Sequence, residues 1–264
     1  MSDLVARFFL KYSSRLSGLR QFPGLGEVTH RISHRILAPD RRFWIQVQKG
    51  AGKGLRLRVY PRTGRTFYEG GAEPALQELL MQRLRPGMVF YDLGANIGFF
   101  TLLAARAVGP TGKIFAFEAD PELAQYLAEH IERNGVRTAR VIRRAVWSST
   151  GTVTFRRADA SASPDRGLGR VVSASTPSED TFAVPCISLD DFVGEEPLPD
   201  FIKCDVEGAE VQVFAGARKV LEHRPLVACE VHSDDNRVQL TQLFSSLGYS
   251  LNWFTPQHML AVPA

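Results

Sequence analysis

Apolar and polar positions change along the chain between a period of two and a period near 3.6, which predicts strands and helices in alternation. Residues 89–92 form an apolar run rich in strand formers, and residues 99–108 follow a helical pattern after a glycine-bearing turn. The strand-like residues 113–117 and the helical residues 121–133 repeat the succession, and Asn134-Gly135 is a typical helix end. Strands alternating with helices predict an α/β fold around a mostly parallel sheet.

The second half of the chain continues this alternation. Strands are expected at residues 140–146, 151–155, 184–189, 201–204 and 226–231. Helices are expected at residues 189–192, 211–221 and 236–247, and an antiparallel pair of strands at 249–254 and 259–262. Residues 158–181 are rich in Ser, Ala, Gly, Pro and Asp with little periodicity, which predicts a mobile loop, either a substrate-side lid or disorder.

Residues 1–85 form an extension ahead of the domain expected at residues 86–264. A hairpin is predicted from 43–48 and 55–60, and helices at 4–16, 28–37 and 73–84. Arg and Lys lie among the apolar positions of the first helix, so it is basic and amphipathic. It either touches a membrane surface or a lipid-linked substrate, or packs on its own domain or on a second subunit of a homo-oligomer; we prefer the packing role.

The turn after the first strand of the domain carries candidate chemistry. Asp92, Gly94, Asn96 and Gly98 mark it, and Glu118 ends the next strand twenty residues later, where an acid commonly holds ribose hydroxyls. The dinucleotide fingerprint would place glycine where Asn96 stands, and a carboxylate such as Asp92 repels phosphate and attracts an ammonium group. A ligand with a ribose and an ammonium but no phosphate fits better, and S-adenosylmethionine is one.

A second group of polar residues follows the strand at 201–204. Asp205 and Glu207 lie beyond the carboxyl end of that strand, so they should face the same crevice as Glu118. Glu230 and His232 lie on one side of the strand at 226–231. His232 or Asp205 is a candidate general base. Alternatively, Asp205, Glu207 and Glu230 are candidate ligands of a divalent cation such as magnesium.

Composition narrows the class of protein. With 264 residues and 44% hydrophobic positions, the chain can bury one substantial core. The net charge of +4 is concentrated in residues 1–42, which argues against a nucleic-acid surface around the crevice. The chain has no apolar run long enough for a membrane span and no signal-peptide pattern, and its three cysteines are widely spaced in apolar stretches. These features favour a cytoplasmic protein with reduced thiols.

Several motifs together resemble those of the FkbM family of methyltransferases. They are Leu84-Arg85-Pro86-Gly87, Tyr91 to Gly98, Phe117 to Pro121, Ser188-Leu189-Asp190 and, most diagnostic, Lys203-Cys204-Asp205-Val206-Glu207-Gly208-Ala209-Glu210. The resemblance covers residues 69–232. It implies a class I, Rossmann-like methyltransferase fold: a doubly wound, mostly parallel seven-stranded sheet with an antiparallel last hairpin.

The resemblance also implies a function: an S-adenosylmethionine-dependent O-methyltransferase that acts on a hydroxyl of a sugar, glycoside or polyketide-type product. Asp92, Gly94, Asn96 and Gly98 would line the methionine end of the cofactor, and Glu118 would take its ribose. Sheet geometry makes Ala145 and Val146 candidate neighbours of the adenine. Asp205, Glu207 and His232 are the candidate catalytic residues, and a small-molecule or glycan acceptor is the expected partner.

Three other functions stay open from the sequence. An NAD-dependent oxidoreductase is disfavoured by Asn96 and Asp92. A non-catalytic binding module would have no need to keep Asp92, Glu118, Asp205 and Glu207 together. A methyltransferase of nucleic acid or of a lipid-linked acceptor is a further alternative; the near-neutral charge beyond residue 42 makes nucleic acid the less favoured of these acceptors.

Overall fold

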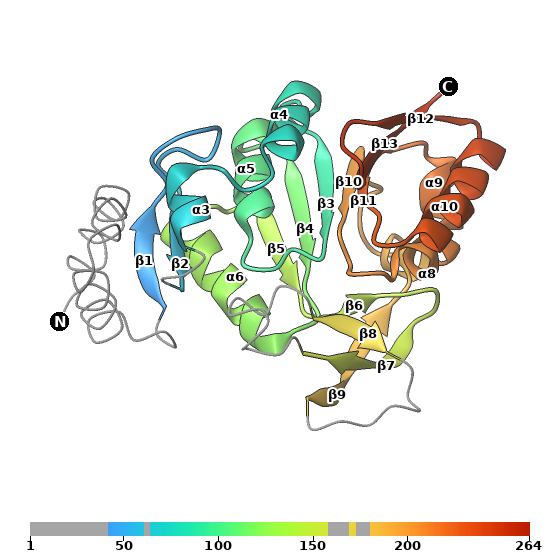
Figure 1. Cartoon of the computed structure of the whole chain (residues 1–264), viewed down its shortest axis with the longest axis horizontal. Coiled ribbons are helices and arrows are strands. Elements are labelled where there is room, and N and C mark those ends of the chain that lie inside the picture. The colour runs from blue at the N-terminus through green and yellow to red at the C-terminus, as the bar shows by residue number, and fades with distance from the viewer. Residues whose placement is uncertain (1–41, 61–63, 158–168, 173–179) are drawn as a thin grey trace, which may run out of the picture. The chain divides into compact units, whose positions relative to one another are not determined.

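The computed structural model describes residues 42–60, 64–157, 169–172 and 180–264 (Figure 1). Contacts divide this part of the chain into two compact units, one that ends at Pro74 and one that begins at Ala75. The helices expected at 4–16 and 28–37 lie outside the described residues.

The first unit contains the predicted hairpin. Strands β1 (Phe43–Gln46) and β2 (Arg56–Val59) pair antiparallel, and Ile45 and Leu57 are among the apolar side chains that they bury. The six-residue helix α3 (Gly64–Glu69) follows and was not predicted. It is too short to show a helical period in the sequence.

The second unit is built around a seven-stranded sheet in the order β12-β13-β11-β10-β3-β4-β5. All neighbours from β11 to β5 run parallel, whereas β13 pairs antiparallel with both β11 and β12. The strands are β3 (Val89–Leu93), β4 (Lys113–Phe117), β5 (Ala139–Ile142), β10 (Phe201–Cys204), β11 (Leu226–Glu230), β12 (Tyr249–Trp253) and β13 (His258–Pro263). The fold class predicted from the sequence is confirmed.

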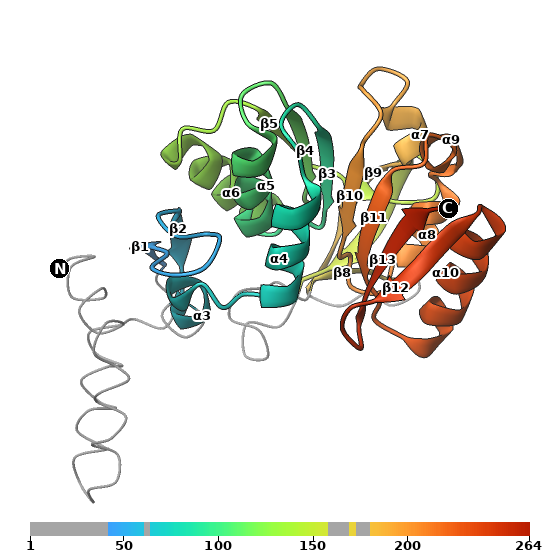
Figure 2. The same ribbon diagram turned by 90° about the horizontal axis from the view of Figure 1, so that it is seen from above.

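Helices cover both faces of this sheet, as Figure 2 shows. On one side lie α4 (Pro74–Arg83), α5 (Phe99–Val108) and α6 (Pro121–Arg133); on the other lie α7 (Leu189–Phe192), α8 (Glu210–Ala215), α9 (Arg218–Glu222) and α10 (Asp234–Ser246). Because side chains alternate along a strand, neighbouring residues of β3 point toward opposite helix layers. Tyr91 points toward α7 and packs edge-on against Phe115 and Phe192. The carboxyl ends of β3, β4 and β10 meet at one edge between these layers, which positions the site.

The strand predicted at residues 140–146 is in fact two strands. β5 stays in the central sheet, whereas β6 (Ala145–Val146) joins a separate four-stranded sheet in the order β6-β9-β7-β8. The other members are β7 (Gly151–Arg156), β8 (Arg170–Val172) and β9 (Thr181–Ile187). The chain turns between β5 and β6, where the amide of Arg144 donates to the carbonyl of Ile142. Part of the loop predicted at 158–181 is therefore strand, and residues 158–168 and 173–179 of it lie outside the described residues.

The helix predicted at residues 211–221 is likewise broken, into α8 and α9, at Gly216. A Cβ atom on Gly216 would lie 2.6 Å from the carbonyl oxygen of Trp147. The carbonyl of Gly216 accepts a hydrogen bond from the amide of Asp190 at the start of α7. The break thus comes from close backbone packing between segments distant in sequence.

Candidate active site

The turn from β3 to α5 has a left-handed backbone at three positions: Gly94 (φ 73°), Asn96 (φ 52°) and Gly98 (φ 87°). A Cβ on Gly94 would lie 1.8 Å from the carbonyl oxygen of Asp205, so only glycine lets this turn approach the end of β10. A Cβ on Gly98 would lie 2.3 Å from Leu127, so that glycine serves the packing of α5 on α6.

Asp92 lies buried beneath this turn. Its Oδ2 accepts a hydrogen bond of 2.6 Å from Thr101, and its Oδ1 lies 3.4 Å from Nζ of Lys203. Lys203 is itself buried, and its Nζ also donates to the carbonyl of Gly94 (2.9 Å) and to Oδ2 of Asp205 (3.3 Å). Lys203 therefore links the end of β10 to the turn after β3.

Glu118 lies at the end of β4, and both of its oxygens accept backbone hydrogen bonds. Oε1 accepts from the amide of Asp120 (2.8 Å) and Oε2 from the amide of Asn96 (2.7 Å). Burial outweighs these bonds and raises the pKa of Glu118 to about 7. Asp120 in turn caps α6 and forms a two-point ion pair with Arg157. Backbone hydrogen bonds thus fix the position of the Glu118 carboxylate.

A cavity opens at this edge of the sheet. Its walls include Gly94, Asn96 and Glu118 on one side, Asp205 and Glu207 at another, and apolar side chains of both sheets. The apolar and remaining lining residues are Phe117, Ala119, Leu123, Arg144, Ala145, Val146, Phe155, Gly169, Arg170, Val171, Val206 and Ala209.

The structure brings most of the predicted residues to this cavity. Seven of them line it: Gly94, Asn96, Glu118, Ala145, Val146, Asp205 and Glu207. Asp92 and Gly98 lie behind the wall, where Asp92 holds Thr101 and Lys203 and Gly98 packs on α6. The sequence did not single out the wall supplied by Phe155 and residues 169–171, because it belongs to the second sheet.

His232 lies among four carboxylates beside the cavity. Its Nδ1 is 2.8 Å from Oε1 of Glu210, and its Nε2 is 3.4 Å from Oε2 of Glu207. Oδ1 of Asp205 and Oε1 of Glu230 lie 3.8 and 3.9 Å from the same Nε2.

The charges of this cluster shift two pKa values. Burial lowers the pKa of His232, but the hydrogen bond to Glu210 and the nearby carboxylates outweigh it and raise the pKa to about 9. Burial and the charge of Asp205 raise the pKa of Glu207 to about 7. At neutral pH the imidazole therefore carries a proton on both nitrogens and pairs as a cation with these carboxylates.

Glu210 is a site residue that the sequence did not identify, because an acid in the first turn of a helix is common without any further role. Its side chain is fully buried and accepts from the amide of Gly208 (2.8 Å), from Nδ2 of Asn236 (2.6 Å) and from His232. The signal in the sequence was that Glu210 follows Glu207 by three residues and that the next strand leads to a histidine.

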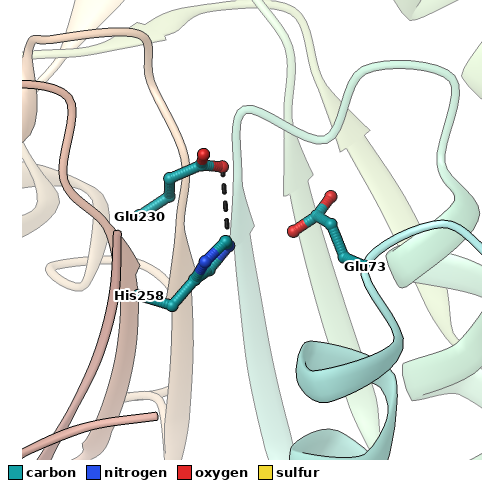
Figure 3. A group of neighbouring side chains, drawn as sticks. All are labelled: Glu73, Glu230 and His258. Carbon is teal, nitrogen blue, oxygen red and sulfur yellow. Dashed lines mark ion pairs between the residues drawn. The ribbon is translucent and has the colours of Figure 1, made fainter. Parts of the chain in front are cut away.

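Glu230 faces two histidines. Its Oε1 is the atom near His232, whereas its Oε2 pairs with Nε2 of His258 at 3.6 Å (Figure 3). Nδ1 of His258 lies 2.8 Å from the hydroxyl of Thr255, which fixes the ring. Of the three carboxylates predicted as cation ligands, Glu230 is therefore the one most engaged elsewhere.

An α/β fold of this topology, with an acid directly after β4 and a cavity at the carboxyl ends of its parallel strands, defines a class I methyltransferase architecture. The model of the methyltransferase FkbM domain matches residues 92–259, and the chain belongs to this family. Family membership confirms the resemblance seen in the sequence, together with S-adenosylmethionine as the cofactor.

Two curated proteins illustrate the relationship. The hexuronic acid methyltransferase AglP of Haloferax volcanii is 29% identical over 169 residues, which cover 63% of this chain and 65% of that protein. The protein-L-isoaspartate O-methyltransferase of Aeropyrum pernix is 36% identical over 125 residues, or 47% of each chain. The chain thus spans two thirds or less of the length of these relatives.

Among solved structures, the methyltransferase FkbM from Methylobacillus flagellatus superposes with a TM-score of 0.50 at 19% identity. The match covers 76% of this chain and 54% of that one, and it shows a shared fold. None of the helices in the described part of the chain combines the length and the apolar character needed to span a bilayer.

Proposed function

We propose that the protein is an S-adenosylmethionine-dependent O-methyltransferase whose acceptor is a hydroxyl of a sugar, glycoside or polyketide-type natural product. The observation that carries the proposal is that Glu118, Asp205 and Glu207 line one cavity, with Nε2 of His232 3.4 Å from Glu207. A hydroxyl is a poor nucleophile, and this end of the cavity supplies groups that take a proton. The relative that acts on a hexuronic acid supports a sugar as the acceptor.

The cavity divides by chemistry into three parts that fit the donor. Ala145, Val146 and the apolar side chains near them suit a flat aromatic base, and Glu118 suits a ribose diol. The turn at Gly94 and Asn96 leads toward Asp205, where the amino-acid end would lie. When bound, S-adenosylmethionine supplies a methyl group already activated by the sulfonium charge.

The work of this chain is then alignment and proton transfer. An acceptor oxygen must be held behind the methyl carbon while the carbon–oxygen bond forms and the carbon–sulfur bond breaks. The hydroxyl proton passes to a group at this end of the cavity, for which Asp205, Glu207 and, once it has lost its own proton, His232 are the candidates. The products are the methyl ether, S-adenosylhomocysteine and a proton.

A second acceptor chemistry follows from the hexuronic acid relative, since such a sugar offers a carboxylate oxygen as well as hydroxyls. A carboxylate is already deprotonated at neutral pH and needs no base. The product would then be a methyl ester, which alkali hydrolyses, whereas a methyl ether survives alkali. Alkaline treatment of the methylated product therefore separates the two acceptors.

Thermal melting with S-adenosylmethionine, S-adenosylhomocysteine or NAD is the first test. A ligand that binds the native state raises the melting temperature once it exceeds its dissociation constant. We expect a shift with the two sulfur nucleosides and none with NAD; a shift with NAD alone would support the oxidoreductase alternative. Glu118→Ala should abolish the shift, and Glu132→Ala, at an exposed position of α6, should preserve it.

Activity on a panel of glycan, polyketide, lipid-linked and RNA acceptors then tests the substrate class. His232→Ala should lower kcat and leave the dissociation constant of the cofactor unchanged, with the exposed His223→Ala as the matched control. A fully active His232→Ala protein would remove His232 from the chemistry. Membrane contact through residues 4–16, a homo-oligomer and a cytoplasmic location remain predictions.

A further inference from the structure

We propose that Asp205, Glu207 and His232 form a binding site for one divalent first-row transition-metal ion, for which Mn²⁺ is the probe. One ligand atom of each of these residues lies within 4.8 Å of the other two. Nε2 of His232 is 3.4 Å from the nearest oxygen of Glu207 and 3.8 Å from that of Asp205. Two atoms each about 2.1 Å from one ion are about 3.0 Å apart when adjacent and about 4.2 Å apart when opposite. The measured separations lie within that window.

An unsatisfied oxygen points independently to a cation. Oδ2 of Asp205 accepts a hydrogen bond from Lys203, but Oδ1 of Asp205 is buried and makes no hydrogen bond to any residue that the structure describes. It is this oxygen that faces Nε2 of His232. A buried carboxylate oxygen that has no hydrogen bond and only a 3.8 Å contact with an imidazole nitrogen is costly, because buried polar atoms in proteins are nearly always hydrogen-bonded. An ion between Oδ1 and Nε2 would satisfy it.

The imidazole is held in the orientation that a metal ligand requires. Glu210, whose side chain is fully buried, accepts a hydrogen bond from Nδ1 of His232. A metal ion would displace the proton of Nε2 while Nδ1 keeps its own, and the lone pair of Nε2 would then point to Asp205 and Glu207. A carboxylate that orients a histidine in this way is the usual support behind a metal-binding imidazole. Asn236 and the amide of Gly208 fix Glu210 in turn.

The donor set favours a first-row transition-metal ion over magnesium. Magnesium favours oxygen ligands alone, whereas one imidazole nitrogen with two carboxylates suits Mn²⁺ and its first-row neighbours. The sequence suggested Glu230 as the third ligand and magnesium as the ion. In the structure His232 occupies the central position, and Glu230 is paired with His258 (Figure 3).

A catalytic role for the ion rests on the proposed function, although binding of the ion does not. Asp205 and Glu207 line the cavity, so open coordination positions would face the acceptor. Two neighbouring oxygens of a sugar could fill them, and the ion would lower the pKa of the bound hydroxyl. The hydroxyl proton then passes to solvent, and His232 holds the ion instead of taking the proton.

The test is titration of Mn²⁺ into the full-length, chelator-treated protein without cofactor or acceptor. Calorimetry measures the binding, and electron paramagnetic resonance measures the loss of the free-ion signal. We expect one ion per chain and tighter binding of Mn²⁺ than of Mg²⁺. Asp205→Asn and His232→Gln should each weaken binding at least tenfold, and Glu210→Gln by about 10–100-fold, the usual effect of losing an orienting partner.

The controls are Asp235→Asn and His223→Gln, which alter exposed residues of the same types and should bind Mn²⁺ as the wild type does. Circular dichroism verifies that each variant is folded. If Glu210→Gln does not fold, the result for Asp205→Asn decides the test. Absence of stoichiometric binding, or binding that survives both ligand variants, would overturn the proposal. A melting shift with S-adenosylmethionine but no Mn²⁺ binding would overturn the metal site alone; Mn²⁺ binding without that shift would overturn the proposed function alone.

Discussion

Replacing Glu118 by glutamine should change how stability depends on pH in a calculable way. Burial raises the pKa of Glu118 from 4.5 to about 7 in the folded protein. The folded state therefore keeps a proton over a pH range in which the unfolded chain has already lost it, so stability falls as the pH rises through that range. The full effect is about 3 kcal/mol, and about 2.5 kcal/mol of it falls between pH 5 and pH 8. Glutamine has no such proton to lose.

Urea-induced unfolding of both proteins at pH 5, 6, 7 and 8, without ligand, measures this difference. The glutamine side chain of the variant can accept only one of the two backbone hydrogen bonds, which costs about 1–3 kcal/mol at every pH. Because that cost is constant, the wild type should lose about 2.5 kcal/mol relative to the variant as the pH rises from 5 to 8. For Glu132→Gln, at an exposed position, the unfolding free energy should depend on pH as it does for the wild type. If the unfolding free energies of Glu118→Gln and the wild type change equally between pH 5 and pH 8, the argument is refuted.

Three further predictions concern packing and buried charge. Gly94→Ala should prevent accumulation of folded protein in a solubility assay, because its Cβ would lie 1.8 Å from a carbonyl oxygen, whereas Gly135→Ala, with a similar φ but open space, should cost only about 1 kcal/mol by urea unfolding. Lys203→Met leaves Asp92 buried without its cation and should lower the unfolding free energy by about 3–5 kcal/mol; exposed Lys113→Met should be nearly neutral. All three cysteines are buried and burial raises their pKa, so a thiol reagent should label none in the native protein and three after denaturation.

The elements best predicted from the sequence are those with local end signals. Helix α6 has Asp120 as its N-cap, Pro121 at its first position and Gly135 just beyond its end, and both bounds agree with the prediction. The continuous pattern over residues 140–146 gave no sign that the chain changes sheets after Ile142. Which sheet a strand joins depends on partners distant in sequence, as does the break at Gly216 against Trp147.

The same distinction applies to the site. Gly94, Asn96 and Glu118 follow a spacing that the sequence displays, and they meet in the cavity as expected. The contact between Glu210 and His232 joins residues 22 positions apart, and only the folded sheet brings them together. The acids at each strand end could be identified from the sequence, but not which of them would accept the hydrogen bond from the histidine.

Lys203 has a consequence for how the two ends of the cavity respond to each other. The ammonium group of Lys203 contacts Asp92, the carbonyl of Gly94 and Asp205. The turn after β3 and the carboxylates around His232 therefore interact with the same positive charge. Any ligand that draws Lys203 toward one end must change the free energy of binding at the other. Thermodynamic reciprocity then requires that the factor by which a cation alters affinity for the methyl donor equal the factor by which the donor alters affinity for the cation.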